Sequence, residues 1–160
     1  EDSYLYRYLT PLETLDYYGR LFGLRRGERR RRSEQLLDMV GLAGVADRKV
    51  KKLSGGMVRR LGVAQALVHE PQVLVVDEPT VGLDVLNALE MQDIIKELKE
   101  QGKTILFSTH IMSEAERLCD RIAIIHNGQI LTCNTLDILR QETGEHYLED
   151  IFLYYVKGLS

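Results

Sequence analysis

Residues before position 70 carry the hydrophobic spacing of amphipathic helices. Apolar side chains recur every three or four residues in the segments 11–22, 33–40 and 54–68, and this period places them on one face of a helix. Thr10-Pro11-Leu12-Glu13 has the pattern of a capping box with proline at the first helical position. The first part of the chain is therefore expected to be helical.

A short apolar run follows at 73–76, continuous and rich in β-branched residues, which is typical of a parallel strand covered on both faces. The segment 104–108 predicts a second buried strand. The segment 85–101 between them has helical spacing, so strand, helix and strand predict one right-handed β-α-β unit.

The last fifty residues predict a hairpin and short helices. Asn127-Gly128 lies between two apolar runs, which is a strong signal for a two-residue hairpin turn. Ser113-Glu114-Ala115-Glu116 has the capping-box pattern and predicts a helix that begins there. The segments 135–142 and 147–156 predict two closing helices, and the whole pattern indicates an α/β fold.

Composition limits the class of protein. The chain has 160 residues, of which 44% are hydrophobic and 28% charged, as expected of a globular protein. Its formal net charge of −3 argues against a general nucleic-acid binder, and no apolar stretch approaches the ~20 residues that span a bilayer. Cys119 and Cys133 form neither a zinc motif nor a disulfide framework, which fits a reducing compartment. Because the chain starts at Glu1 and not at a methionine, it is expected to begin inside a larger domain.

Six arginines between residues 25 and 32 open the second predicted helix. A strongly charged, solvated helix start is the simplest interpretation. Contact with acidic lipid headgroups or with an acidic partner is the functional alternative.

Ser54-Gly55-Gly56 stands at the start of the third predicted helix. A helix N-terminus has unpaired backbone N–H groups and a partial positive charge, and glycine lets an anion approach the backbone closely. An ordinary Ser-Gly turn before a helix would have the same tripeptide. The candidate chemistry therefore depends on what lies near it.

Asp77 and Glu78 end the first predicted strand, and His110 follows the second. Ligands of open α/β sheets bind at the carboxyl ends of the strands, so all three side chains are expected at one edge. One carboxylate can hold Mg²⁺ through water, and the other can orient and deprotonate an attacking water. A charged strand end at the surface is the plain alternative.

The motifs together resemble those of the ATP-binding-cassette (ABC) ATPases. Four segments resemble the family's signature, Walker B strand, D-loop and switch histidine: Leu53-Ser54-Gly55-Gly56-Met57, Val73 to Pro79, Gly82-Leu83-Asp84 and Ser108-Thr109-His110. They occur in family order over nearly the whole chain. The resemblance implies a helical signature subdomain at 1–68. It also implies a partial P-loop NTPase (RecA-like) parallel core at 69–160, with a C-terminal hairpin and helices.

In this family two copies sandwich two ATP molecules head to tail. By resemblance, Ser54, Gly55 and Gly56 would grip the γ-phosphate of a nucleotide held by the opposite copy. Asp84 would couple the two sites across that dimer.

The resemblance also implies the catalytic roles. Asp77 would support Mg²⁺ and Glu78 would act as general base on water. His110 would contact the γ-phosphate and register its loss. The implied protein is the nucleotide-binding subunit of an ABC transporter, an ATP hydrolase at the cytoplasmic face of the cell membrane. Its partners would be a second such domain and a membrane-spanning permease, and no nucleic acid.

Two departures from the family pattern stand out. The sequence has no G-x-x-x-x-G-K-[ST] phosphate loop, which the family places upstream of this segment. The 160 residues alone are therefore expected to hydrolyse little or no ATP. Glu1 aligns with the glutamine of the family's Q-loop, and a carboxylate there can approach Mg²⁺ but cannot donate hydrogen bonds as an amide does.

Two other functions remain open. One is a cassette ATPase that acts on ribosomes or chromosomes without a transporter. The other is a non-enzymatic interaction module that has lost its phosphate loop. The segment 148–152 resembles the ending of exporter-type cassettes and favours a transporter.

Overall fold

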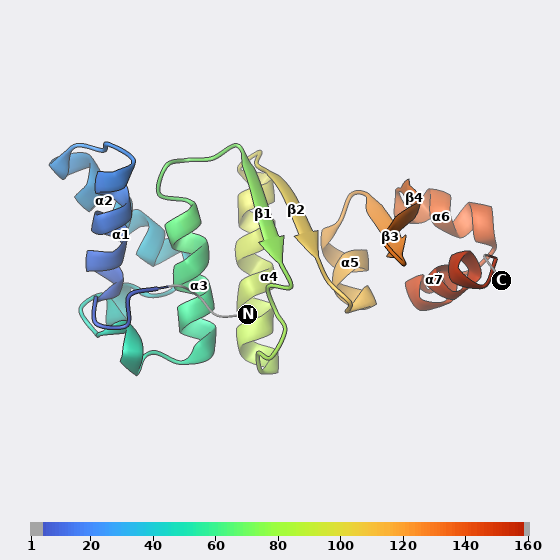
Figure 1. The fold of residues 1–160 in the computed structure, drawn as a ribbon, viewed down its shortest axis with the longest axis horizontal. Coiled ribbons are helices and arrows are strands. Elements are labelled where there is room, and N and C mark those ends of the chain that lie inside the picture. Colours follow the sequence, from blue (N-terminus) through green and yellow to red (C-terminus); the bar gives the residue numbers. More distant parts are fainter. Residues whose placement is uncertain (1–4, 159–160) are drawn as a thin grey trace. The chain divides into compact units, whose positions relative to one another are not determined.

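The computed structural model describes residues 5–158, and their contacts group into two compact units, 1–108 and 109–160 (Figure 1). In chain order, the elements of the first unit are α1 Pro11–Leu21, α2 Arg26–Met39, η1 Ala43–Val45, η2 Val50–Lys52, α3 Gly55–Ala66, β1 Val73–Asp77, α4 Val85–Glu100 and β2 Thr104–Ser108. Those of the second unit are α5 Met112–Leu118, β3 Ile122–His126, β4 Gln129–Asn134, α6 Leu136–Thr143 and α7 Leu148–Lys157. The α/β class is confirmed, while the domain boundary expected after residue 68 stays a prediction.

Helix α1 begins at the predicted capping box. The Thr10 side chain accepts a hydrogen bond from the Glu13 backbone N–H at 3.1 Å, and Glu13 Oε2 accepts one from the Thr10 N–H at 2.8 Å. The apolar faces of α1, α2 and α3 pack together, and Leu15, Leu36 and Leu61 are at most 1% exposed. Burial of these leucines holds the helical part of the first unit together.

Some arginines of the run in α2 make contacts with other elements, and others are exposed to solvent. Arg29 donates from Nε to Asp16 Oδ1 at 2.7 Å and from Nη1 to the Leu24 carbonyl at 2.8 Å. Arg32 donates to the Leu67 carbonyl at 2.9 Å and pairs with Glu70 at 3.3 Å. These two arginines tie α2 to its neighbours, so the run is only partly a solvated face.

Asp16 makes the first unit sensitive to acid. The hydrogen bond from Arg29 holds the pKa of Asp16 below its ordinary value of 3.8, and Arg20 adds to the effect. A lowered pKa in the folded state stabilises the protein above the ordinary pKa, and this contribution is lost as the pH falls through the folded-state value. We therefore expect Asp16→Asn to lose less stability than the wild type between pH 5 and pH 3, measured by urea unfolding across that range. Parallel curves for the two proteins would contradict the assignment.

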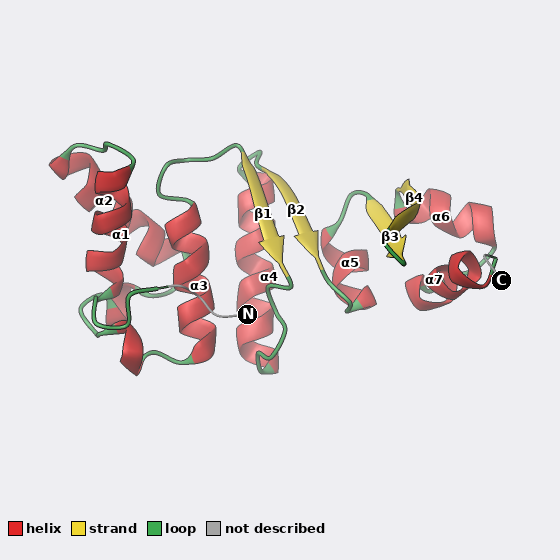
Figure 2. Ribbon diagram, viewed as in Figure 1, coloured by secondary structure: helices red, strands yellow, loops and turns green. Residues whose placement is uncertain are grey.

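Strands β1 and β2 pair in parallel, with the register running from Val73 opposite Thr104 to Asp77 opposite Ser108. Helix α4 joins them, as the predicted β-α-β unit requires (Figure 2). The sheet is covered on one face only within the described residues: Leu74 is 5% exposed, whereas Val75 and Leu106 are 71% and 65% exposed. The expectation that both faces are covered is wrong for this part of the chain. Apolar strand composition does not say whether a second layer is present.

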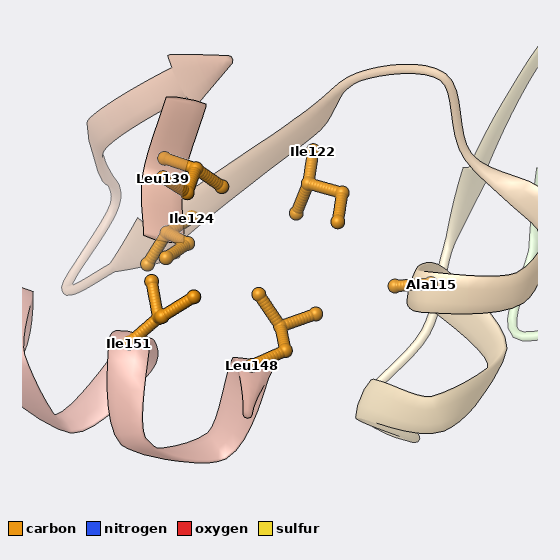
Figure 3. Close-up of a cluster of buried hydrophobic side chains, with 6 residues drawn as sticks. All are labelled: Ala115, Ile122, Ile124, Leu139, Leu148 and Ile151. Atoms are coloured by element: carbon orange, nitrogen blue, oxygen red, sulfur yellow. The ribbon is translucent and has the colours of Figure 1, made fainter. Parts of the chain in front are cut away.

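In the second unit, the predicted hairpin is present. Strands β3 and β4 pair antiparallel, and both Asn127 and Gly128 have positive φ, as a type I′ turn requires. Figure 3 shows side chains of the hairpin and of three helices pointing toward one another in a core of Ala115, Ile122, Ile124, Leu139, Leu148 and Ile151.

The capping box predicted at Ser113 is wrong. Helix α5 begins at Met112, and its N-cap, Ile111, lies two residues before Ser113 and makes no side-chain capping bond. Glu116 is used elsewhere, because its Oε1 accepts a hydrogen bond from the Leu148 backbone N–H at 2.9 Å.

Candidate active site

Ser54 caps the N-terminus of α3. Its hydroxyl oxygen accepts a hydrogen bond from the Met57 N–H at 3.3 Å. The N–H groups of the first helical residues, Gly55 and Gly56, have no partner within the helix itself. This end of α3 therefore offers backbone donors and partial positive charge to an anion.

The two glycines of this tip lie in different surroundings. A Cβ built on Gly55 would meet nothing within 4 Å, so the backbone there is open to a ligand. A Cβ on Gly56 would lie 2.3 Å from Oδ1 of Asn87 in α4. A side chain at position 56 would therefore have to displace Asn87, and a phosphate contact at Gly56 stays a prediction.

At the end of β1, Ser108 joins the two candidate carboxylate residues. Its hydroxyl donates to Asp77 Oδ1 and accepts from the Glu78 N–H at 3.1 Å. The Glu78 N–H also lies 3.2 Å from the Ser108 carbonyl oxygen. Register places Ser108 directly opposite Asp77. The sequence placed Ser108 only in the segment before His110 and gave it no role of its own, although the pairing of two five-residue strands would have pointed to it.

Glu78 has a backbone conformation that is unusual for a glutamate. Its φ is +43°, in the left-handed region that residues with a Cβ rarely adopt. The Glu78 carbonyl accepts a hydrogen bond from Arg59 Nη1 of α3 at 2.8 Å. A cavity of about 500 Å³ opens here, and Arg59, Asp77, Glu78 and Met91 are among the residues that line it.

Asp84 is the N-cap of α4, as Ser54 is of α3. Its Oδ1 accepts from the Asn87 backbone N–H at 3.1 Å, and its Oδ2 accepts from the Asn87 side-chain amide at 2.5 Å. The hydrogen bond from the Asn87 backbone N–H lowers the pKa of Asp84 below its ordinary value of 3.8, and the hydrogen bond from the Asn87 side chain lowers it further. Asn87 is a further residue that sequence reasoning missed, and its place at the third position of a capped helix is the signal that was available.

Two predicted site residues lie outside the described part of the first unit. Glu1 is not among the described residues. His110 is exposed and belongs to the second unit, just after Thr109, whose hydroxyl donates to Glu114 at 3.0 Å. The roles inferred for Glu1 and His110 stay predictions.

The end of β1 presents oxygen groups of the kind that bind hard cations. Among residues 5–158, no three His, Cys, Asp or Glu side chains form a cluster that could hold a metal ion. Asp77 and the Ser108 hydroxyl supply hard oxygen ligands, and Mg²⁺ commonly takes its other ligands from phosphate and water.

In the part of the chain that the structure describes, no helix is long and apolar enough to cross a membrane.

Comparison with known proteins identifies the family. The ABC transporter family model matches residues 2–81, half of the chain. The ABC transporter ATP-binding protein NatA of Bacillus subtilis is 39% identical over 157 residues, covering 98% of this chain and 64% of NatA. The Nod factor export ATP-binding protein I of Ralstonia nicotianae is 48% identical over 120 residues, covering 75% of this chain and 40% of that protein.

A solved structure shares the fold. The ATP-binding subunit of an ABC transporter superposes with a TM-score of 0.83 at 33% identity, covering 98% of this chain and 66% of that one. The chain thus spans about two fifths to two thirds of the length of these proteins. Its parallel strands and helices form part of the P-loop NTPase fold. On this evidence the chain belongs to the family of ABC transporter ATP-binding domains.

Proposed function

We propose that the full-length protein is the nucleotide-binding subunit of an ABC transporter and couples ATP hydrolysis to transport. The observation that supports this most is the joining of Asp77 and Glu78 to β2 through Ser108. That arrangement holds the Asp77 carboxylate and the Glu78 backbone at the carboxyl end of a parallel sheet, where a nucleotide phosphate binds in this class of fold.

In this proposal some residues bind the nucleotide and its metal ion, and one residue accepts a proton. The N-terminus of α3, with Ser54 and Gly55, binds the γ-phosphate of a nucleotide held by a second copy. Mg²⁺–ATP supplies the reacting phosphate and neutralises its charge. Asp77 orients the metal, and Glu78 accepts the proton of the attacking water.

The helical part of the first unit offers a surface for a membrane-spanning permease. A groove of about 930 Å³ lies between α1 and α2, with Leu9, Leu12 and Tyr17 beside Arg20 and Arg30. Glu13 and Asp16 also line the groove, so a segment with apolar side chains and with side chains of both charges would fit it. Contact with a permease there would place the protein at the cytoplasmic face of the membrane.

ATP hydrolysis by the full-length protein tests the proposed function. We expect Mg²⁺-dependent phosphate release from the full-length protein. From residues 1–160 alone we expect a rate at least about a hundredfold lower, because no phosphate loop is present in them to bind the nucleotide. Phosphate release can be followed with a coupled enzymatic assay, with and without a chelator of Mg²⁺. Equal rates for the two proteins would contradict this assignment of roles.

A further inference from the structure

The N-termini of α3 and α4 meet at Gly56 and Asn87. The two helices are in contact within the first unit (Figure 1). The side chain of Asn87 fills the space that a Cβ on Gly56 would need, with its Oδ1, Cγ and Cβ at 2.3, 2.5 and 3.0 Å from that position. Gly56 is buried and Asn87 is half-buried, so this is an interior contact between two capped helix ends.

Asn87 is fixed on its other side by Asp84. Its amide Nδ2 donates to Asp84 Oδ2 at 2.5 Å, while its backbone N–H donates to Asp84 Oδ1 at 3.1 Å. One side chain therefore touches the tip of α3 and holds the carboxylate that caps α4. Rotating the amide away from Gly56 would break the bond between Nδ2 and Asp84.

Two further contacts bind α3 to the same segment. Arg60 Nη1 pairs with Glu90 Oε2 of α4 at 2.9 Å, and Arg59 donates to the Glu78 carbonyl at 2.8 Å. Both lie within the turn of α3 that follows Gly56. The helix that carries the tip is thus held at several points along the segment from β1 to α4.

We propose that Asn87 is a positioning residue that fixes the Ser54–Gly56 tip and the Asp84 carboxylate relative to each other. The inference rests on the proposed function, in which the tip of α3 binds a nucleotide held by a second copy, and on the coupling of the two sites that the family resemblance implies for Asp84. A nucleotide then meets one preformed surface, so no ordering of these groups is needed when it binds. In this view Gly56 is a glycine because Asn87 occupies the space beside it.

A set of four variants of the full-length protein tests the contact. Gly56→Ala forces Asn87 out of place, and we expect the equilibrium constant for unfolding to rise about tenfold or more. Asn87→Ala removes the Oδ1 and Cγ atoms at 2.3 and 2.5 Å and leaves only the Cβ at 3.0 Å, so Gly56→Ala made in the Asn87→Ala background should change the constant less than about threefold. Gly55→Ala is the matched control, because open space surrounds that position, and it should be neutral or stabilising. Equal effects of Gly56→Ala in both backgrounds, measured by urea unfolding, would overturn the contact.

A second measurement distinguishes a positioning role of Asn87 from an effect on the stability of the fold alone. We expect Asn87→Ala to weaken ATP-driven association of two copies about tenfold, followed by sedimentation velocity. The affinity of a single copy for ATP should change less than about twofold. Unchanged association in Asn87→Ala would overturn the positioning role. A wild-type protein that neither binds nor hydrolyses ATP would overturn the proposed function, while the unfolding measurements would still decide the contact.

Discussion

Phosphate release by the full-length protein is expected to fall about 10²- to 10⁴-fold when Glu78 is replaced by glutamine, the usual contribution of a general base. The amide keeps the size of the side chain and the same backbone strain at this position, but it cannot accept a proton from water. ATP binding should change less than about threefold, since the phosphates contact other groups. The two quantities are measured by a phosphate-release assay and by equilibrium binding of a fluorescent ATP analogue.

Glu97→Gln is the matched control for this variant. Glu97 is exposed on α4, where its side chain accepts a hydrogen bond from Gln101 at 3.1 Å. The control should release phosphate at the wild-type rate. If Glu78→Gln retained more than a tenth of that rate, Glu78 would not be the base.

Arg60→Ala is expected to lower the free energy of unfolding by about 2–3 kcal/mol. Arg60 is 8% exposed, and its Nη1 donates to the Val40 carbonyl at 3.3 Å and pairs with Glu90 at 2.9 Å. Truncation removes packing around the long side chain and leaves a buried carbonyl without its donor. Urea unfolding of the full-length protein followed by circular dichroism measures the change.

Arg30→Ala provides the comparison for Arg60. Arg30 pairs with Glu34 one turn along α2, but its side chain is 80% exposed, and an exposed pair of this kind contributes less than about 0.5 kcal/mol. We expect the two variants to differ by about 2 kcal/mol. Similar small losses from both would show that Arg60 does not hold α3 against α4.

Local sequence signals predicted most of the element order, because each depends on neighbouring residues. The capping box of Thr10 and Glu13 forms as expected, and Asn127-Gly128 makes the turn of the hairpin. The predicted strand 104–108 has the observed bounds, and the helix predicted at 85–101 ends one residue earlier. Here backbone preference and burial favour the same structure.

The candidate site was predictable only in part, because its contacts join distant segments. Asp77 and Glu78 could be placed at a strand end from the sequence alone. The contacts of Ser108 with both residues, and of Asn87 with Gly56, depend on how strands and helices pack. Periodicity likewise could not show that one face of the sheet is uncovered in this chain. It reports which side chains are apolar and not which layer covers them.

The φ of +43° at Glu78 implies that the loop after β1 stores conformational energy. A residue with a Cβ in this region costs about 1–2 kcal/mol. The bonds to Ser108 and Arg59 hold Glu78 there against that cost. Loss of either bond would favour relaxation of the peptide toward a negative φ, which turns the carboxylate to a new direction. The orientation of the proposed base is thus set by Ser108 of β2 and Arg59 of α3. A mutation of Ser108 or Arg59 can therefore misalign the Glu78 carboxylate although the carboxylate itself is unchanged.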